Sequence, residues 1–130
     1  MRLKHAEHNE ELCLIINALP GNKYNDWVVT TAFYSCIHLV EHKLFPLEVN
    51  GKTYKNFNSY YHAFFVNTNN SLSKHEAKIE LVDVYIATVS SNYRWLFDAC
   101  MNARYKNYIV SDMIATIAIQ TLTLIKKACI

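Results

Sequence analysis

Hydrophobic residues recur every three to four positions through most of the chain, which is the period of an α-helix. Residues that commonly stop helices interrupt the periodic stretches at Pro20, Gly21 and Pro46. Ser73 followed by Glu76 forms a capping box, which opens a further helix. The pattern predicts five helices, at about 2–19, 25–45, 73–89, 93–104 and 111–127.

Residues 26–44 carry two distinct stripes of side chains on one predicted helix. The apolar stripe consists of Val29, Phe33, Cys36, Ile37, Val40 and Leu44. The opposite stripe consists of Trp27, Thr31, Tyr34, His38 and Glu41. A surface helix needs only the first stripe, and the second is too aromatic for a solvated face. We therefore expect another element or a ligand to cover the second stripe.

The remaining segments complete the expected fold. On the first helix, Leu12, Ile15, Ile16 and Leu19 fall on one side, which we expect to face the core. Residues 47–72 are rich in Asn, Ser and Tyr and are typical of a long loop, with a short helix at about 59–66. The expected fold is all-α, a single domain spanning 1–130. It is an antiparallel bundle of four to five helices, with one long loop between the second and third helices.

Composition supports this fold and excludes some classes of protein. Two glycines and two prolines supply too little turn chemistry for a many-stranded sheet. The net charge of +2 neither indicates nor excludes a nucleic-acid binder. Ser111, Asp112 and Gln120 interrupt the apolar run at 109–125, whose apolar stretches are shorter than the ~20 residues of a membrane span. We therefore expect a buried helix there and no membrane contact.

The four cysteines, at positions 13, 36, 100 and 129, form neither a CxxC pair nor a zinc-binding spacing. Cys36 and Cys100 fall on apolar stripes, where a thiol behaves as a small hydrophobic group. The chain shows no signal-peptide pattern. We expect reduced, buried thiols in a cytoplasmic protein.

One short motif suggests a metal. Residues 38–42, with His38, Glu41 and His42, match the H-x-x-E-H form found in some zinc proteases. Five residues are a weak signature, and the chain is small for such a protease. We predict no metal and no other cofactor.

Several polar residues are expected to meet at one end of the bundle. His75 lies at the start of the third helix and Arg104 at the end of the fourth, so a hairpin near Ser90 would place both roughly 20 Å from the turn. Antiparallel packing brings His38, in the last turns of the second helix, to the same end. The starts of the last and first helices contribute Ser111, Asp112, Arg2, His5 and His8. This polar corner is the candidate site.

The same residues also have structural interpretations. A histidine such as His75 at a helix start on an apolar face is more often a satisfied structural residue than a catalytic one. Arg104, in the last turn of its predicted helix, is suited to cap carbonyl groups and to interact favourably with the negative end of the helix dipole. The stripe of Trp27, Tyr34 and His38 is more typical of packing or of a dimer contact than of a cofactor site.

Three segments of the chain resemble a HEPN domain, a small helical family named for its occurrence in higher eukaryotes and prokaryotes and for nucleotide binding. The first segment lies at 24–41 and contains Asp26, Trp27, Phe33, Tyr34 and His38. The second lies at 73–78 and contains Ser73, His75, Glu76 and Lys78, the last where the family commonly has arginine. The third contains Tyr93, Leu96, Phe97, Arg104, Tyr105 and Lys106. Together they span most of residues 24–106.

The resemblance implies a helical bundle that commonly dimerises and works in toxin–antitoxin, defence or RNA-processing systems. Many members of the family are metal-independent ribonucleases, whose hallmark is an arginine followed four to six positions later by a histidine. This chain departs from that hallmark, because its last histidine is His75 and neither Arg94 nor Arg104 has a histidine after it. Arg2 and His8 have the spacing, but they lie in the first helix rather than a late one.

The leading hypothesis is a non-catalytic HEPN-like module. It would be a homodimer that binds nucleotide, RNA or a protein partner, such as a nucleotidyltransferase-type antitoxin, through the polar corner and the loop. Dimerisation is expected from the apolar segment at 109–125 and from the second stripe of residues 26–44. The binding residues are Lys78, Tyr105, Tyr34 and Trp27.

The alternative hypothesis is a metal-independent endoribonuclease with a rearranged site. Arg104 would stabilise the negative charge that develops at phosphorus, and His75 or His38 would act as the general acid or base. Histidine suits this task because its ordinary pKa lies near neutrality. A third interpretation is a structural dimerisation domain whose corner is only a polar network.

Overall fold

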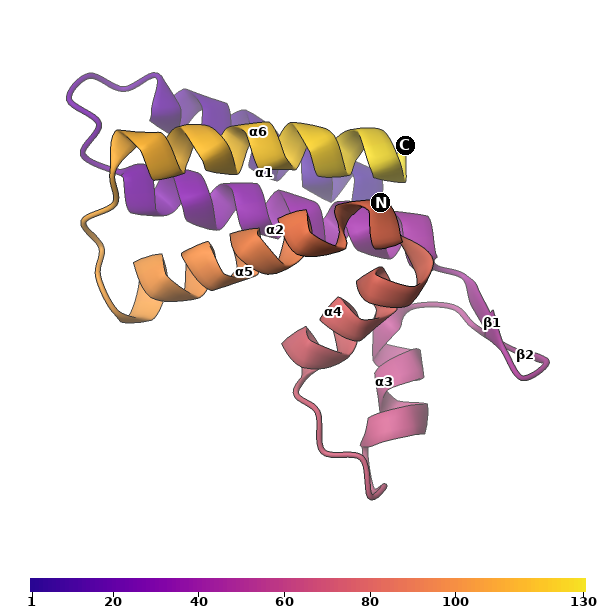
Figure 1. Cartoon of the computed structure of the whole chain (residues 1–130). Helices are drawn as coiled ribbons and strands as arrows, with labels where there is room; N and C mark the ends of the chain where they lie inside the picture. Colours follow the sequence, from indigo (N-terminus) through magenta and orange to yellow (C-terminus); the bar gives the residue numbers. More distant parts are fainter.

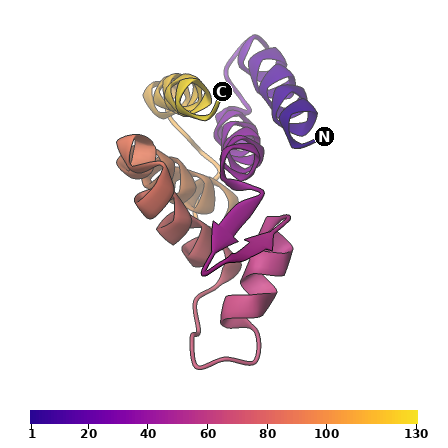
Figure 2. The ribbon, with the colours of Figure 1, turned by 90° about the vertical axis from the view of Figure 1, so that its right-hand side faces the viewer.

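Helix α2 (Asn25–Leu44) is the central element of the fold, and twelve of its twenty residues are buried. The computed structural model describes residues 1–130, and Figure 1 shows α1 (Arg2–Asn17), α5 (Ser90–Tyr105) and α6 (Asp112–Cys129) running alongside α2. The end-on view in Figure 2 places α1, α6 and α5 on different sides of α2. The fold is an all-α bundle, as the sequence predicts.

The directions of the helices follow from contacts along α2. Helix α1 is antiparallel to α2, because Arg2 reaches the last turn of α2 and Cys13 reaches Val28 near its start. Helix α6 is parallel to α2, because Asp112 at its start meets Asn25. Helix α5 runs antiparallel to α2 (Figure 1). The end of α5 therefore lies near the start of α2.

Helix α1 packs on α2 through a different face from the one that its sequence pattern predicts. Leu12, Ile15 and Leu19 are exposed, and the buried residues are Ala6 and Cys13. Small side chains let the two helices approach closely, so that polar groups of one helix reach carbonyl groups of the other. The Ser35 hydroxyl donates to the Ala6 carbonyl at 2.7 Å, and the Cys13 thiol donates to the Val28 carbonyl at 3.4 Å. The predicted core face of α1 is thus wrong, because Ile16 alone among its four residues is half-buried.

The predicted break near Ser90 is confirmed. Helix α4 (Lys74–Tyr85) is followed by a 3₁₀ turn, η1 (Ala87–Val89), and α5 begins directly after it. The capping box at the start of α4 is also confirmed, because the Glu76 amide donates to the Ser73 hydroxyl at 3.2 Å. The Ser73 amide donates in return to the Glu76 carboxylate at 3.3 Å. Ser111 caps α6 in the same manner, accepting from the Ile114 amide.

The segment between α2 and α4 contains more regular structure than the loop that we expect from its composition. Strands β1 (Leu47–Val49) and β2 (Lys52–Tyr54) form an antiparallel hairpin, and α3 (Phe57–Phe65) follows, close to the predicted short helix. The hairpin turn is Asn50-Gly51, and both residues have positive φ, as a tight two-residue turn requires. This Asn-Gly pair is the sequence signal that predicts a hairpin, and our loop expectation missed it.

Aromatic rings join the hairpin and α3 to the end of the bundle. Tyr54 and Tyr60 lie with ring centroids 6.0 Å apart, and Phe45, just after α2, packs edge-on against Phe57 at 6.3 Å. Helices α3 and α4 project from this end of the bundle (Figure 1). None of the helices has the length and apolar character needed to cross a bilayer. All four cysteines are buried and unpaired, as expected.

Candidate functional site

The second stripe of α2 lies in the opening between α1 on one side and α4 and α5 on the other. Trp27 is exposed, and Tyr34, His38 and Glu41 are half-buried. Thr31 is the exception, because it is buried and donates to the Trp27 carbonyl at 2.7 Å. Side chains from the flanking helices meet this stripe one after another. We call Trp27, Tyr34, His38 and Glu41, with the contacting residues His5, His75, Lys78 and Arg104, the seam.

Arg104, from the end of α5, meets the middle of the seam. It donates a hydrogen bond to the hydroxyl of Tyr34, and its guanidinium lies 5.6 Å from the centroid of the Tyr34 ring. The same guanidinium lies 5.3 Å from the ring of Tyr105. Arg104 is itself exposed, so its charge faces solvent beside two aromatic rings. This arrangement leaves Arg104 available to an anion.

Two histidines meet one turn further along α2. The rings of His5, on α1, and His38 have centroids 4.5 Å apart. Burial lowers the pKa of His38 below its ordinary value, and the neighbouring His5 and Lys78 lower it further, whereas Glu41 acts in the opposite direction. The neutral imidazole is therefore favoured at His38.

A buried ion pair closes the seam at the end of α2. Lys78, on α4, contacts the Glu41 carboxylate at 2.8 Å, and the side chains are 9% and 20% exposed. The Lys78 ammonium also lies 4.3 Å from the ring centroid of Phe57, on α3. Lys78 therefore contacts residues of two other helices, and the Glu41 carboxylate is its only ion-pair partner.

His75 is the member of the seam that packs inward and does not lie on its open surface. Its half-buried ring packs 5.3 Å from Phe97 and 6.0 Å from Phe33. Burial lowers the pKa of His75, and the charge of Lys78 adds to this effect. The placement favours the structural interpretation of His75, as a neutral ring between α2 and α5.

The predicted polar corner does not form as one cluster. Asp112 accepts a hydrogen bond from Asn25 at the start of α2, whereas Arg2 donates to the carbonyl of Glu41 near its end. Sixteen residues separate these two positions of α2, which is about 24 Å of helix. Because α6 runs parallel to α2, the start of α6 lies at the opposite end of α2 from the start of α1.

The other members of the corner are spread out along the seam. Arg104 meets Tyr34, and His38 meets His5 one turn further on. Arg2 is a cap, since it donates to the carbonyls of Glu41, Phe45 and Lys55. His8 lies on the exposed side of α1. The structure gives the Arg2 and His8 pair no shared site.

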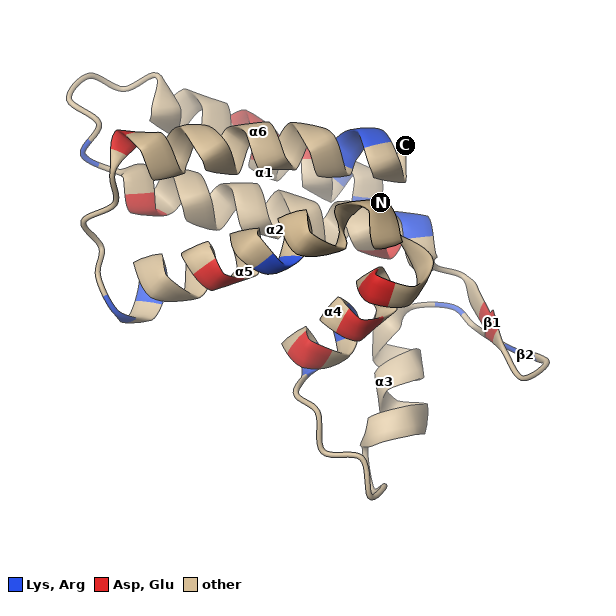
Figure 3. Cartoon of the chain, in the orientation of Figure 1, with Lys and Arg blue, Asp and Glu red and all other residues tan.

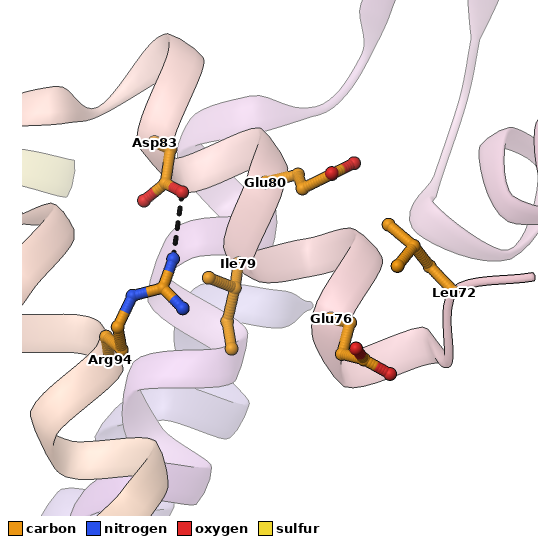
Figure 4. A pocket seen from close by; sticks show the side chains of 6 residues that line it. All are labelled: Leu72, Glu76, Ile79, Glu80, Asp83 and Arg94. Atoms are coloured by element: carbon orange, nitrogen blue, oxygen red, sulfur yellow. Dashed lines mark hydrogen bonds and ion pairs between the residues drawn. The ribbon is translucent and has the colours of Figure 1, made fainter.

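Five cavities of the molecule lie away from the seam, and neither His75 nor Arg104 lines any of them. Figure 4 shows a groove of about 250 Å³ on the outer side of α4, lined by Leu72, Glu76, Ile79, Glu80, Asp83 and Arg94. Figure 3 shows that acidic residues recur along α4. We call this groove the acidic groove.

No group of three or more histidine, cysteine or acidic side chains is placed to hold a metal ion. No family model, curated protein or solved structure matches the chain.

Two parts of the seam escape sequence-based reasoning. The pairing of Lys78 with Glu41 depends on how α4 is oriented against α2, and no local sequence pattern predicts this orientation. The contact of His5 with His38 can be predicted only if the face of α1 that packs on α2 is known. The apolar residues of α1 predict a different face. The small residues Ala6 and Cys13, seven positions apart on α1, are the signal that indicates the face used.

Proposed function

We propose that the protein is a HEPN-like, non-catalytic binding module that acts as a cytoplasmic homodimer and binds RNA or nucleotide along the seam. The observation that carries the proposal is that α1, α4 and α5 each bring a basic or imidazole side chain to one half-open face of α2. These side chains are His5, Lys78 and Arg104, which lie beside His38 of α2, and the seam holds one carboxylate, that of Glu41.

Exposed aromatic rings lie at the end of the molecule where the seam begins. Four of the five exposed aromatic residues, namely Tyr24, Trp27, Tyr105 and Tyr108, flank the start of α2 or the end of α5. Exposed rings interspersed with basic residues such as Lys23 and Lys106 suit single-stranded RNA, because bases stack on aromatic faces and cations track the phosphates.

The geometry gives the ribonuclease alternative less support. A general acid or base must reach the scissile phosphate together with the group that stabilises its charge. His75 packs against the rings of Phe33 and Phe97, while Arg104 is hydrogen-bonded to Tyr34, and neither residue lines any of the five cavities. The sequence also lacks an Arg and His pair of the usual spacing in a late helix.

Binding of a short, labelled, single-stranded RNA, measured by fluorescence anisotropy at low salt, tests the proposal. Arg104→Ala and Trp27→Ala should each weaken binding about tenfold, because each removes a charge or a stacking ring. Arg94→Ala is the matched control, since it removes an exposed arginine of the same helix α5 that lies in the acidic groove. Equal losses for Arg94→Ala and Arg104→Ala would mean that binding follows overall charge and not the seam.

Two further measurements separate the alternatives. ATP should compete with the RNA if the seam accepts nucleotides. RNA incubated with the protein in EDTA should stay intact, and cleavage that His75→Ala or Arg104→Ala abolishes would establish the ribonuclease instead. If neither RNA nor ATP binds, the proposal is wrong, and a protein partner such as a nucleotidyltransferase-type antitoxin becomes the ligand to test.

A further inference from the structure

Helix α5 carries a second stripe of side chains on the side that faces away from α2. The stripe consists of Trp95, Asp98, Ala99 and Asn102. These four positions fall within about 100° of one another around the helix axis. Phe97, which packs against Phe33 of α2, and Arg104, which meets the seam, lie about half a turn away around the same helix. The two sides of α5 therefore face separate surroundings.

A hollow of about 360 Å³ lies between this side of α5 and helix α6. Six of its eight lining residues are hydrophobic, namely Trp95, Ala99, Ile109, Val110, Ile114 and Ile117. The other two, Asp98 and Asn102, both belong to α5. Sites for small molecules have this character, because apolar walls supply most of the contact and a few polar groups fix the orientation. We call this cavity the apolar hollow.

The side chains of α5 give the apolar hollow its room and one aromatic wall. Ala99 is its smallest lining residue, and it lies one turn after Trp95. Trp95 is only half-buried, so part of its indole surface stays accessible from the hollow. An aromatic or aliphatic group that enters beside Ala99 can pack on this ring.

The charge of Asp98 has no counterpart within the chain. Asp98 is exposed and belongs to none of the three ion pairs of the molecule. Arg94, one turn earlier on the same helix, pairs with Asp83 instead. The residues that α6 contributes to the hollow are uncharged. One wall of the hollow therefore offers a free carboxylate, and the facing wall is apolar.

We propose that the apolar hollow binds a small amphipathic amine, whose apolar body lies on Trp95 and whose ammonium group donates to the Asp98 carboxylate. The side-chain oxygen of Asn102, one turn further along α5, provides a second acceptor. A hydrogen bond between an ammonium and a carboxylate is stronger than one between neutral groups. The same carboxylate disfavours an anionic ligand of equal size.

The shape of the site favours a small molecule over a helix of another protein. An α-helix with its side chains is about 10–12 Å across, so it would rest on the rims of α5 and α6. Its main contacts would then be exposed residues such as Met113 and Leu124, which do not line the hollow. A small amine instead reaches Ala99 and Asp98 together.

A series of three probes with the same apolar body tests the ligand class. Phenylbutylamine, phenylbutanol and phenylbutanoate are cationic, neutral and anionic in turn. Binding is followed through the fluorescence of Trp95 in a Trp27→Phe background, because the chain contains two tryptophans. The amine should bind about tenfold more tightly than the alcohol, owing to its charge-assisted hydrogen bond, and the carboxylate should bind more weakly than either.

Two matched variants test the role of Asp98. Asp98→Asn should abolish the preference for the amine over the alcohol, because the substituted side chain has nearly the same shape and no charge. Glu80→Gln is the control, since Glu80 is also exposed and unpaired but lies in the acidic groove. It should leave the tenfold preference intact. Equal effects of the two variants would mean that the amine follows overall charge, and the proposal would be wrong.

Filling the hollow tests the place of the apolar body. Ala99→Leu should weaken binding of both the amine and the alcohol at least about tenfold, because its added carbons occupy the hollow. Its thermal unfolding should show that the variant remains folded. The test with Asp98→Asn does not depend on this variant. Unchanged affinities in a folded Ala99→Leu variant would place the probes elsewhere and overturn the proposal.

The remaining outcomes separate this inference from the other functions. If no probe alters Trp95 fluorescence, the hollow is not an amine site. If Ile117→Glu in addition converts a dimeric native protein into a monomer on sedimentation, a second copy covers the hollow instead. Because the seam lies on the other side of α5, saturating phenylbutylamine should leave RNA affinity unchanged. Amine binding by a protein that binds no RNA would refute the proposed function and support the amine site.

Discussion

The seam and the acidic groove lie on opposite sides of α4, and each contains one ion pair of nearly the same length. In the seam, Lys78 and Glu41 lie 2.8 Å apart, with side chains 9% and 20% exposed. In the acidic groove, Arg94 and Asp83 lie 3.0 Å apart, with side chains 54% and 37% exposed (Figure 4). Water screens the second pair and hardly reaches the first. Burial, rather than distance, therefore decides which of the two pairs holds the fold together.

The largest expected effect comes from breaking the pair in the seam. Lys78→Ala should lower the free energy of unfolding by about 3 kcal/mol, because it leaves the Glu41 carboxylate largely buried without its counter-charge. Urea denaturation followed by circular dichroism measures this loss. Combining Lys78→Met with Glu41→Leu removes both charges and should recover most of the stability. A double variant as unstable as Lys78→Ala would show that packing, and not charge, accounts for the loss.

Acidification should weaken the side of α4 that faces the seam. Burial lowers the pKa of both His38 and His75, so the unfolded chain takes up protons more readily than the folded one. The stability that these neutral rings contribute is complete above about pH 6.5 and is lost as the pH falls toward their lowered pKa values. Thermal unfolding between pH 7.5 and 5 measures this dependence.

The double variant His38→Gln, His75→Gln should flatten that pH dependence. His62→Gln, which changes an exposed histidine of α3, is the control and should leave the dependence as it is. An equally steep dependence in the double variant would place the responsible groups elsewhere.

A smaller effect is expected where Arg104 meets the seam. Tyr34→Phe should lower the free energy of unfolding by about 1 kcal/mol, because it removes the hydroxyl to which Arg104 donates. Tyr93→Phe is the matched control. It removes a buried hydroxyl that meets no protein hydrogen-bond partner, so stability should be unchanged or raised. Equal losses in the two variants would contradict a specific contribution of the Arg104 contact.

The smallest effect is expected in the acidic groove. Arg94→Ala should change the free energy of unfolding by no more than about 0.5 kcal/mol, because its pair with Asp83 is exposed to water. The same urea titration measures it. A loss as large as that of Lys78→Ala would remove the contrast between the two sides of α4.

The sequence predicts the elements of this fold better than their contacts. Periodicity and caps locate the helices, and Ser73 and Ser111 begin theirs as expected. The predicted face of α1 fails because small residues such as Ala6 and Cys13 allow closer packing than leucine and isoleucine do. Apolar periodicity alone does not report this preference, because the larger leucine and isoleucine side chains dominate the apolar pattern of α1.

The sequence predicts which residues belong to the candidate site, but it does not predict how they are arranged in space. The second stripe of α2 is half-open, and Arg104 meets it, as its position at the end of its helix suggests. The sequence does not predict the contact of Lys78 with Glu41. The single corner fails because the direction of α6 relative to α2 cannot be read from local sequence. Asp112 consequently lies with Asn25, far from Arg2.

Arg2 has a consequence for the order in which the molecule assembles. Its guanidinium reaches carbonyl groups 39 to 53 residues further along the chain, at the end of α2 and just after the hairpin. During synthesis α1 emerges first, but the groups that hold its first turn do not yet exist. The first turn of α1 therefore gains its full set of contacts only after the hairpin has been synthesised, whereas Ala6 and Cys13 can pack on α2 before that.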